Sequence, residues 1–164
     1  MKNKTLIIAL NISILTVAMM FSGCTENQKN DDPQFIAWTI TDENHQQSVL
    51  TRCSEALGAN EWSTLERIAE NGENYVSTVS ILKLNSFTVS SKCLPIKNEY
   101  REYLLDKQQV YHYSKLVGSM MHDEQPSSAQ NYSTMLGDYI QKAKSHLETV
   151  ILMRNQTPTP PTQP

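Results

Sequence analysis

The chain has 164 residues, three cysteines and a formal net charge of −3. This length fits a single domain. An acidic chain lacks the basic footprint that nucleic-acid binding requires, so we expect no nucleic-acid partner.

The first segment, residues 1–23, is predicted to be a lipoprotein signal peptide that is cleaved. Lys2 and Lys4 precede an apolar stretch over residues 6–21, which is short and interrupted for a membrane span of about 20 apolar residues. The stretch ends in Phe21-Ser22-Gly23-Cys24, a lipobox-like pattern in which two small residues precede the acylated cysteine. The sequence therefore predicts lipid on Cys24. The alternatives are a plain transmembrane anchor and an ordinary secretory signal.

Residues 24–33 are predicted to form a polar tether between this lipid and the first helix. Its nine residues after the cysteine, 25–33, span at most about 30 Å when extended. Removal of residues 1–23 takes away two lysines and leaves 12 basic against 17 acidic residues. This balance argues against a polybasic membrane-docking surface, so the acyl groups on Cys24 are expected to supply the membrane attachment.

The segment Ser22-Gly23-Cys24-Thr25-Glu26-Asn27, together with the Thr/Pro tail over residues 155–164, resembles predicted lipoproteins of methanogenic archaea. The middle of the chain resembles them only loosely, as an uncharacterised helical family. The resemblance implies a location on the outer face of the cell membrane and no activity.

Residues 34–154 are predicted to form an all-α domain of four helices. The first helix, 34–57, has a polar middle at 41–47 that we expect to be exposed, and Gly58 is a candidate left-handed stop. The second, 60–83, has Asn60 as candidate N-cap and Gly72 on its apolar stripe, where a close helix crossing is possible. A Ser/Thr-rich connector follows at 86–91.

The third helix, 92–122, has Ser90 or Ser91 as candidate N-cap. A turn at 123–128, where Pro126 prevents continuation, leads to the fourth helix, 128–153. Sustained 3-4 spacing of apolar residues in long segments with short joins predicts an antiparallel four-helix bundle. The tail over residues 155–164 is expected to be disordered. The apolar residues expected to face inward are Phe35, Ile36, Ile40, Val49, Leu50, Cys53, Leu57, Trp62, Leu65, Ala69, Val76, Val79, Leu82, Ile96, Tyr100, Tyr103, Leu104, Val110, Tyr111, Val117, Met121, Tyr132, Leu136, Tyr139, Ile140, Ala143, Leu147, Val150 and Ile151.

No motif in the chain specifies chemistry. The four histidines, His45, His112, His122 and His146, show neither His-x-x-x-His nor the Glu-x-x-His spacing of di-iron bundles. We expect them at the surface or at helix boundaries, and we expect no cofactor. The serines lie in no Gly-x-Ser-x-Gly elbow, and the glycines form no phosphate loop. Tyrosines gather in the third helix, where they either line a ligand groove or pack the bundle with hydroxyls at its wet edge.

Two modification patterns remain. Asn131-Tyr132-Ser133 and Asn155-Gln156-Thr157 match the N-glycosylation acceptor pattern, so Asn131 and Asn155 are candidate sites. Cys53 and Cys93 are the thiols left once Cys24 carries lipid, and exported proteins usually bridge such a pair. The expected geometry argues against this bridge, because a helix of about 20 residues separates the expected positions of the two cysteines by about 30 Å. We predict the bridge only together with a connector, 85–92, that runs back along the bundle.

The sequence thus predicts a lipid-anchored cell-surface helical module with a binding or structural role, attached to the membrane through Cys24. We expect no enzymatic activity. A metal- or cofactor-carrying bundle is the first alternative, and an extracellular enzyme is the second.

Overall fold

The computed structural model describes residues 30–156, which form helices and short connections without a strand. The all-α prediction is therefore confirmed for this part of the chain. The predicted signal peptide, Cys24 and the tail beyond residue 156 lie outside the described residues. The helices are α2 (Asp32–Gly58), α3 (Trp62–Tyr75), the π-helix η1 (Val76–Ser80), α4 (Ile81–Ser86), α5 (Leu94–His122) and α6 (Pro126–Gln156).

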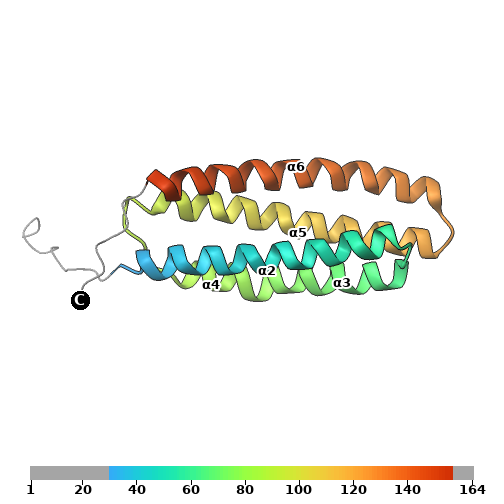
Figure 1. Cartoon of the computed structure of the whole chain (residues 1–164), viewed down its shortest axis with the longest axis horizontal. Coiled ribbons are helices and arrows are strands. Elements are labelled where there is room, and N and C mark those ends of the chain that lie inside the picture. The colour runs from blue at the N-terminus through green and yellow to red at the C-terminus, as the bar shows by residue number, and fades with distance from the viewer. Residues whose placement is uncertain (1–29, 157–164) are drawn as a thin grey trace, which may run out of the picture.

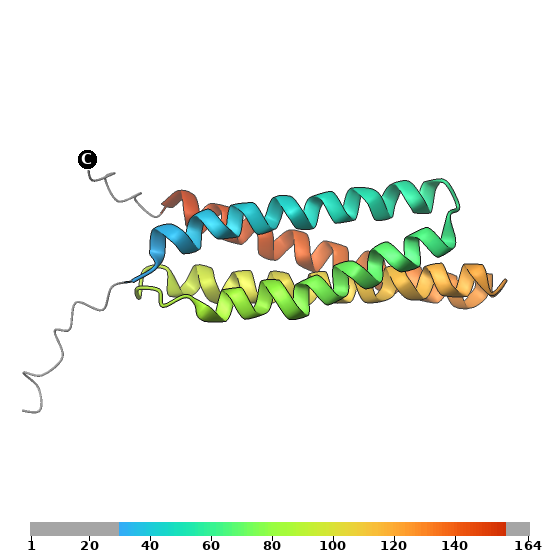
Figure 2. The same cartoon turned by 90° about the horizontal axis from the view of Figure 1, so that it is seen from below.

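The helices lie side by side as an elongated bundle of four helical runs, because α3, η1 and α4 follow one another in a single run (Figure 1). Successive runs point in opposite directions, as the second view also shows (Figure 2). The start of α2, the connector 87–93 and the end of α6 lie at one end of the bundle, which we call the terminal end. The loops 59–61 and 123–125 form the opposite end, which we call the far end.

Several helix boundaries differ from the predicted ones. Cys93, rather than Ser90 or Ser91, is the N-cap of α5, and Glu61, rather than Asn60, is the N-cap of α3. Pro126 is the first residue of α6 and does not merely stop α5, because a proline lacks only a donor that the first turn of a helix leaves unpaired. The last helix continues through Asn155, so the predicted tail begins later than residue 155.

The turn between α2 and α3 uses a left-handed residue, but it is not the predicted glycine. Gly58 ends α2 without a positive φ, whereas Asn60 has a φ of 57°. Asparagine tolerates this conformation better than most side chains, because its short amide bonds locally to the backbone. The amide of Asn60 donates to the carbonyl of Leu57 and closes the turn.

Two glycines permit close approach between α3 and α5. A methyl group added at Gly72 would lie 2.9 Å from the ring of Tyr111, as the predicted close crossing requires. A methyl group added at Gly118 would lie 3.0 Å from the carbonyl oxygen of Trp62, which belongs to the backbone. The crossing of these helices therefore depends on the absence of a side chain at both positions.

The core follows much of the predicted stripe, with two corrections. The polar segment 41–47 is not exposed all round, since Asp42 and Gln46 are buried at 2% and 0% exposure. Some stripe residues instead face solvent, because each lies on an outer flank of its helix; they are Ile40, Leu57, Val79, Leu82 and Ile140. In residues 30–156, no helix combines the length and apolarity that a membrane span requires.

Candidate functional site

A layer of polar side chains crosses the bundle core, and its first part comes from α2. Thr39, Asp42 and Gln46 recur at helical spacing and are all buried on the inner face of α2. Both carboxylate oxygens of Asp42 accept hydrogen bonds. The hydroxyl of Ser80 donates to Oδ1 at 2.7 Å, and the hydroxyl of Tyr100 donates to Oδ2 at 2.9 Å.

The π-helix η1 supplies Ser80, the residue that joins the two halves of this layer. A π-helix shifts the following residues around the helix axis, and such insertions are frequent at functional sites. Ser80 Oγ also accepts a hydrogen bond from Gln46 Nε2 at 3.2 Å. The hydroxyl of Tyr111 donates to Gln46 Oε1 at 2.8 Å. The result is a continuous hydrogen-bonded chain that links α2, η1 and α5 inside the bundle.

Two tyrosines of this layer, Tyr100 and Tyr111, act as hydrogen-bond donors. Tyr100, Tyr103 and Tyr111 are fully buried. Burial raises the pKa of the Tyr100 hydroxyl, and the negative charge of Asp42 raises it further. Burial is also the main cause of the raised pKa of Tyr103 and of Tyr111. The tyrosines pack the bundle, but the hydroxyls of Tyr100 and Tyr111 bond in the core and not at its wet edge.

Lys107 of α5 is a charged member of the layer that the sequence did not point to. Its side chain is only 6% exposed, and Nζ lies 5.4 Å from the centre of the Tyr103 ring. Burial lowers the pKa of Lys107 to about 8, although the negative charge of Glu43 acts in the opposite direction. Lys107 therefore changes charge close to neutral pH.

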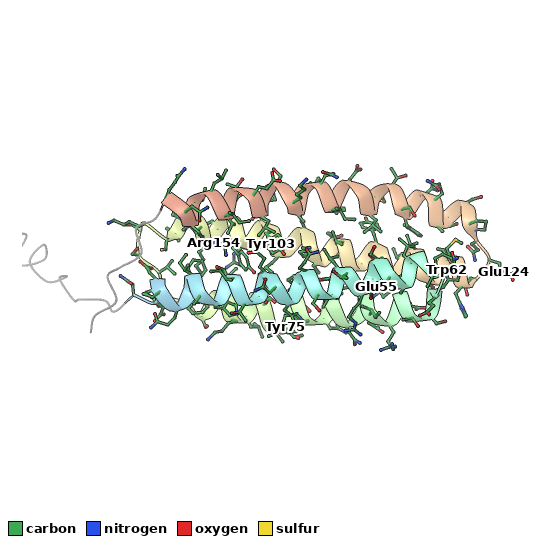
Figure 3. The ribbon with its side chains drawn as sticks, viewed as in Figure 1. Glu55, Trp62, Tyr75, Tyr103, Glu124 and Arg154 are labelled. Carbon is green, nitrogen blue, oxygen red and sulfur yellow. The ribbon has the colours of Figure 1, made fainter. Side chains whose placement is uncertain are left out.

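Arg154 connects the layer to α6. One guanidinium nitrogen lies 2.9 Å from Glu43 Oε2, and the other donates to Thr39 Oγ1 at 3.3 Å. Figure 3 shows Arg154 near the end of α6. This contact ties the last turns of α6 to α2, so that all four helical runs contribute to one polar layer.

The chemistry available to this layer follows from its charges. Asp42 and Glu43 offset Lys107 and Arg154, so that the formal charges of these four groups cancel. Burial raises the pKa of Cys53 to about 11, which keeps its sulfur protonated at neutral pH. A protonated thiol is a weak nucleophile. The arrangement is thus suited to holding helices in register, with Lys107 as a titratable group inside it.

The histidines lie at contacts between helices. The ring of His45 packs on Tyr75 with centroids 4.0 Å apart. His112 Nδ1 lies 3.2 Å from Glu73 Oε1, and His122 Nδ1 lies 3.5 Å from Ser63 Oγ. His146 Nδ1 lies 2.6 Å from Glu99 Oε1. In the part of the chain that the structure describes, no three His, Cys, Asp or Glu side chains are arranged to hold a metal ion.

The predicted Cys53–Cys93 bridge is absent from the structure, and both thiols are free and buried. The connector does not run back along the bundle, because the backbone amides of Thr88 and Ser90 bond to carboxylates at the start of α2. Burial and the adjacent charge of Asp32 raise the pKa of Cys93. Cys53 lies 21 residues beyond Asp32 on the same helix, about 30 Å away, whereas a disulfide needs Cα atoms within about 7 Å.

The remaining candidate residues are spread along α6. Asn131 and Asn155 are both exposed, one near each end of that helix. Between them, Tyr139 stacks on Tyr113 of α5 with ring centroids 5.5 Å apart. Lys142 Nζ lies 4.5 Å above the same Tyr139 ring. This half-buried aromatic contact is part of the seam between α5 and α6.

Fold and polar layer together define the class of this protein as an all-α helical bundle with a hydrogen-bonded polar core. No family model, no curated protein and no solved structure matches the chain. The function is therefore argued from the chain's own residues.

Proposed function

We propose that this protein is a lipid-anchored cell-surface module, exported and held on the outer face of the membrane through lipid on Cys24, with a binding or structural role. The observation that carries the proposal is the position of Cys24. It ends the apolar segment 6–21 in a lipobox-like pattern, and it lies only seven residues before Asp31, the N-cap of α2.

The shape of the bundle supports such a role. The longest described helix, α6, has 31 residues and is therefore about 45 Å long. The chain enters this rod at its terminal end (Figure 1), which leaves the far end free to point away from an anchoring surface. The polar groups of the core bond mainly to one another, as expected of a layer that fixes helix register.

Replacement of the lipidated cysteine tests the proposal. In the expressing cell, the unaltered protein should fractionate with membranes and partition into detergent. The Cys24→Ser variant should be released or should accumulate as the uncleaved precursor, since its side chain cannot form the thioether. Cys53→Ser is the matched control, and it should remain with the membrane. A Cys24→Ser protein that stays membrane-bound, and whose mass equals that of the unaltered protein apart from the substitution itself, would contradict the anchor.

A further inference from the structure

The terminal end carries the most exposed apolar side chains of the described bundle. Leu82 of α4 is 62% exposed, Leu152 of α6 is 61% exposed and Leu94 at the start of α5 is 48% exposed. Each lies within four residues of the end of its helix, which corresponds to about 6 Å along the axis. They come from three different helices, so they surround the tip and do not form the inner stripe of any one helix.

Basic side chains gather around the same tip without carboxylate partners. Lys83 and Lys92 are exposed, Lys97 donates to the carbonyl of Phe87, and Arg101 bonds to the amide of Asn85. Ion pairs in residues 30–156 involve other cations, so these four charges are not neutralised by a contacting carboxylate. The nearby carboxylates of Asp31 and Asp32 accept from the backbone amides of the connector.

The far end has the opposite character. Its loops and the adjoining helix turns contain more acidic than basic residues, and Figure 3 shows Glu55 and Glu124 there. The acidic residues of this region are Glu55, Glu61, Glu66, Asp123 and Glu124, against Arg52, Arg67 and Lys115. The third cation, Lys115, already pairs with Glu73 at 2.7 Å. The far end therefore carries net negative charge, whereas at the terminal end the five cations, with Arg154 included, equal the five carboxylates Asp31, Asp32, Glu99, Glu102 and Glu148 in number.

We propose that the terminal end docks on the headgroup layer of the anchoring membrane, with Leu82, Leu94 and Leu152 in the apolar boundary and Lys83 and Lys92 on lipid phosphates. This inference rests on the proposed lipid anchor at Cys24. Seven residues lead from Cys24 to Asp31, so the tip cannot stand more than about 25 Å from the lipid. The tether thus keeps this end, and not the far end, beside the membrane.

The chemistry of the tip favours a lipid surface as the occupant. Apolar side chains with adjacent cations are the composition by which proteins lie at a bilayer interface, about 5–10 Å into the headgroup and acyl boundary. Each lysine near an anionic membrane surface raises the binding constant of the protein for that surface about fivefold. A second copy of the chain is a poorer occupant, because two tips would bring together the exposed Lys83 and Lys92 of both copies. Docking would change a loosely tethered rod into one that stands in a fixed orientation.

The test uses the full, lipid-bearing protein in vesicles of phosphatidylglycerol and phosphatidylcholine whose acyl chains carry bromine, a contact quencher of tryptophan. Leu94→Trp and Leu152→Trp place probes at the tip, and Leu57→Trp is the matched control, being 41% exposed near the far end. Fluorescence is compared with that of the parent protein, which contains Trp38 and Trp62. For the tryptophan at position 94 or 152, at least about half of the fluorescence that it adds should be quenched, given the interfacial depth. The fluorescence of the tryptophan at position 57 should not be quenched.

Charge reversal gives an independent arm. Lys83→Glu with Lys92→Glu should abolish the extra quenching of the Leu94→Trp probe that anionic lipid produces over phosphatidylcholine alone. Arg52→Glu with Arg67→Glu, at the far end, should leave it unchanged. Protein that floats with vesicles while its tip probes are unquenched, or whose tips crosslink to one another, overturns docking and leaves the anchor standing. Protein that fails to float overturns the anchor, and docking with it.

Discussion

Folding buries the charged side chain of Lys107, and this burial lowers the stability of the folded protein. Its pKa is about 8 in the bundle, whereas a lysine in an unfolded chain titrates near 10.4. Between these values the unfolded chain binds more protons, so the free energy of unfolding rises with pH across that window. The cost of burying the ammonium is fully present below pH 8, and it amounts to about 3 kcal/mol.

Lys107→Met should therefore stabilise the protein at pH 7 by about 2 kcal/mol, since the lost ring contact with Tyr103 offsets about 1 kcal/mol of the gain. Denaturant unfolding at pH 7 and at pH 10.5 measures this, and the gain should vanish at the higher pH. The control is Lys83→Met, which removes an exposed lysine over the Phe87 ring and should change stability little. A loss of stability at pH 7 in Lys107→Met would contradict the assigned cost.

Asp42 should contribute in the opposite direction, because it satisfies two buried hydroxyls. Asp42→Ala leaves the hydroxyl of Ser80 without its acceptor, and it leaves the hydroxyl of Tyr100 only the backbone carbonyl of Thr39 at 3.1 Å. We expect a loss of about 3 kcal/mol in the free energy of unfolding. Glu55→Ala removes an exposed carboxylate of the same helix and should cost less than about 0.5 kcal/mol. Equal small effects in the two variants would mean that the polar layer does not hold the helices.

The sequence pointed away from this layer for a physical reason. A run such as 41–47 that is polar on every face is typical of a solvated helix surface, and its burial depends on partners far along the chain. Asp42 bonds to Ser80 and Tyr100, 38 and 58 residues away, and Gln46 bonds to Ser80 and Tyr111, 34 and 65 residues away. The sequence does show the i, i+3, i+7 spacing of Thr39, Asp42 and Gln46, but spacing alone does not distinguish a buried polar stripe from an exposed one.

At the scale of the helices, the glycines test the packing between α3 and α5. Gly118→Ala should destabilise the protein by about 2 kcal/mol, because its methyl group would press on backbone that cannot rotate away. Gly72→Ala should cost at least as much, because its methyl group would lie 2.9 Å from the buried Tyr111 ring, whose hydroxyl is held by Gln46. Gly137→Ala in α6 is the matched control, with open space around the added methyl, and it should stabilise by about 0.5–1 kcal/mol. Thermal unfolding of the three variants measures the order, and stabilisation by Gly118→Ala would contradict the close crossing.

The presence of the helices was predictable, because apolar residues recur at 3-4 spacing over long segments. The positions of the helix ends were not predictable. The N-caps Glu61 and Cys93 make no side-chain capping bond, so neither end carries a capping signature. The second predicted helix proved to be α3, η1 and α4 in succession, and no residue type marks the π-helix. The disulfide prediction was wrong because it required an extended return of residues 85–92, of which the first two belong to α4.

At the scale of the whole molecule, the net charge does not reveal where the charged residues lie. A net charge of −3 argued against a basic surface, yet unpaired lysines and exposed leucines share one end of the rod. Each helical run carries the chain from one end of the bundle to the other, so residues that share an end lie far apart in the sequence. Their grouping at one end therefore arises only when the chain is folded. The same folding brings the start of α2, and hence the tether, to that end.

Mass spectrometry of the protein isolated from its own cell membrane tests the lipid anchor. A lipid-anchored protein should give an N-terminal peptide that begins at Cys24 and carries lipid on the thiol, with residues 1–23 missing. A membrane-bound protein that retains residues 1–23, or whose N-terminal Cys24 is unmodified, would contradict it.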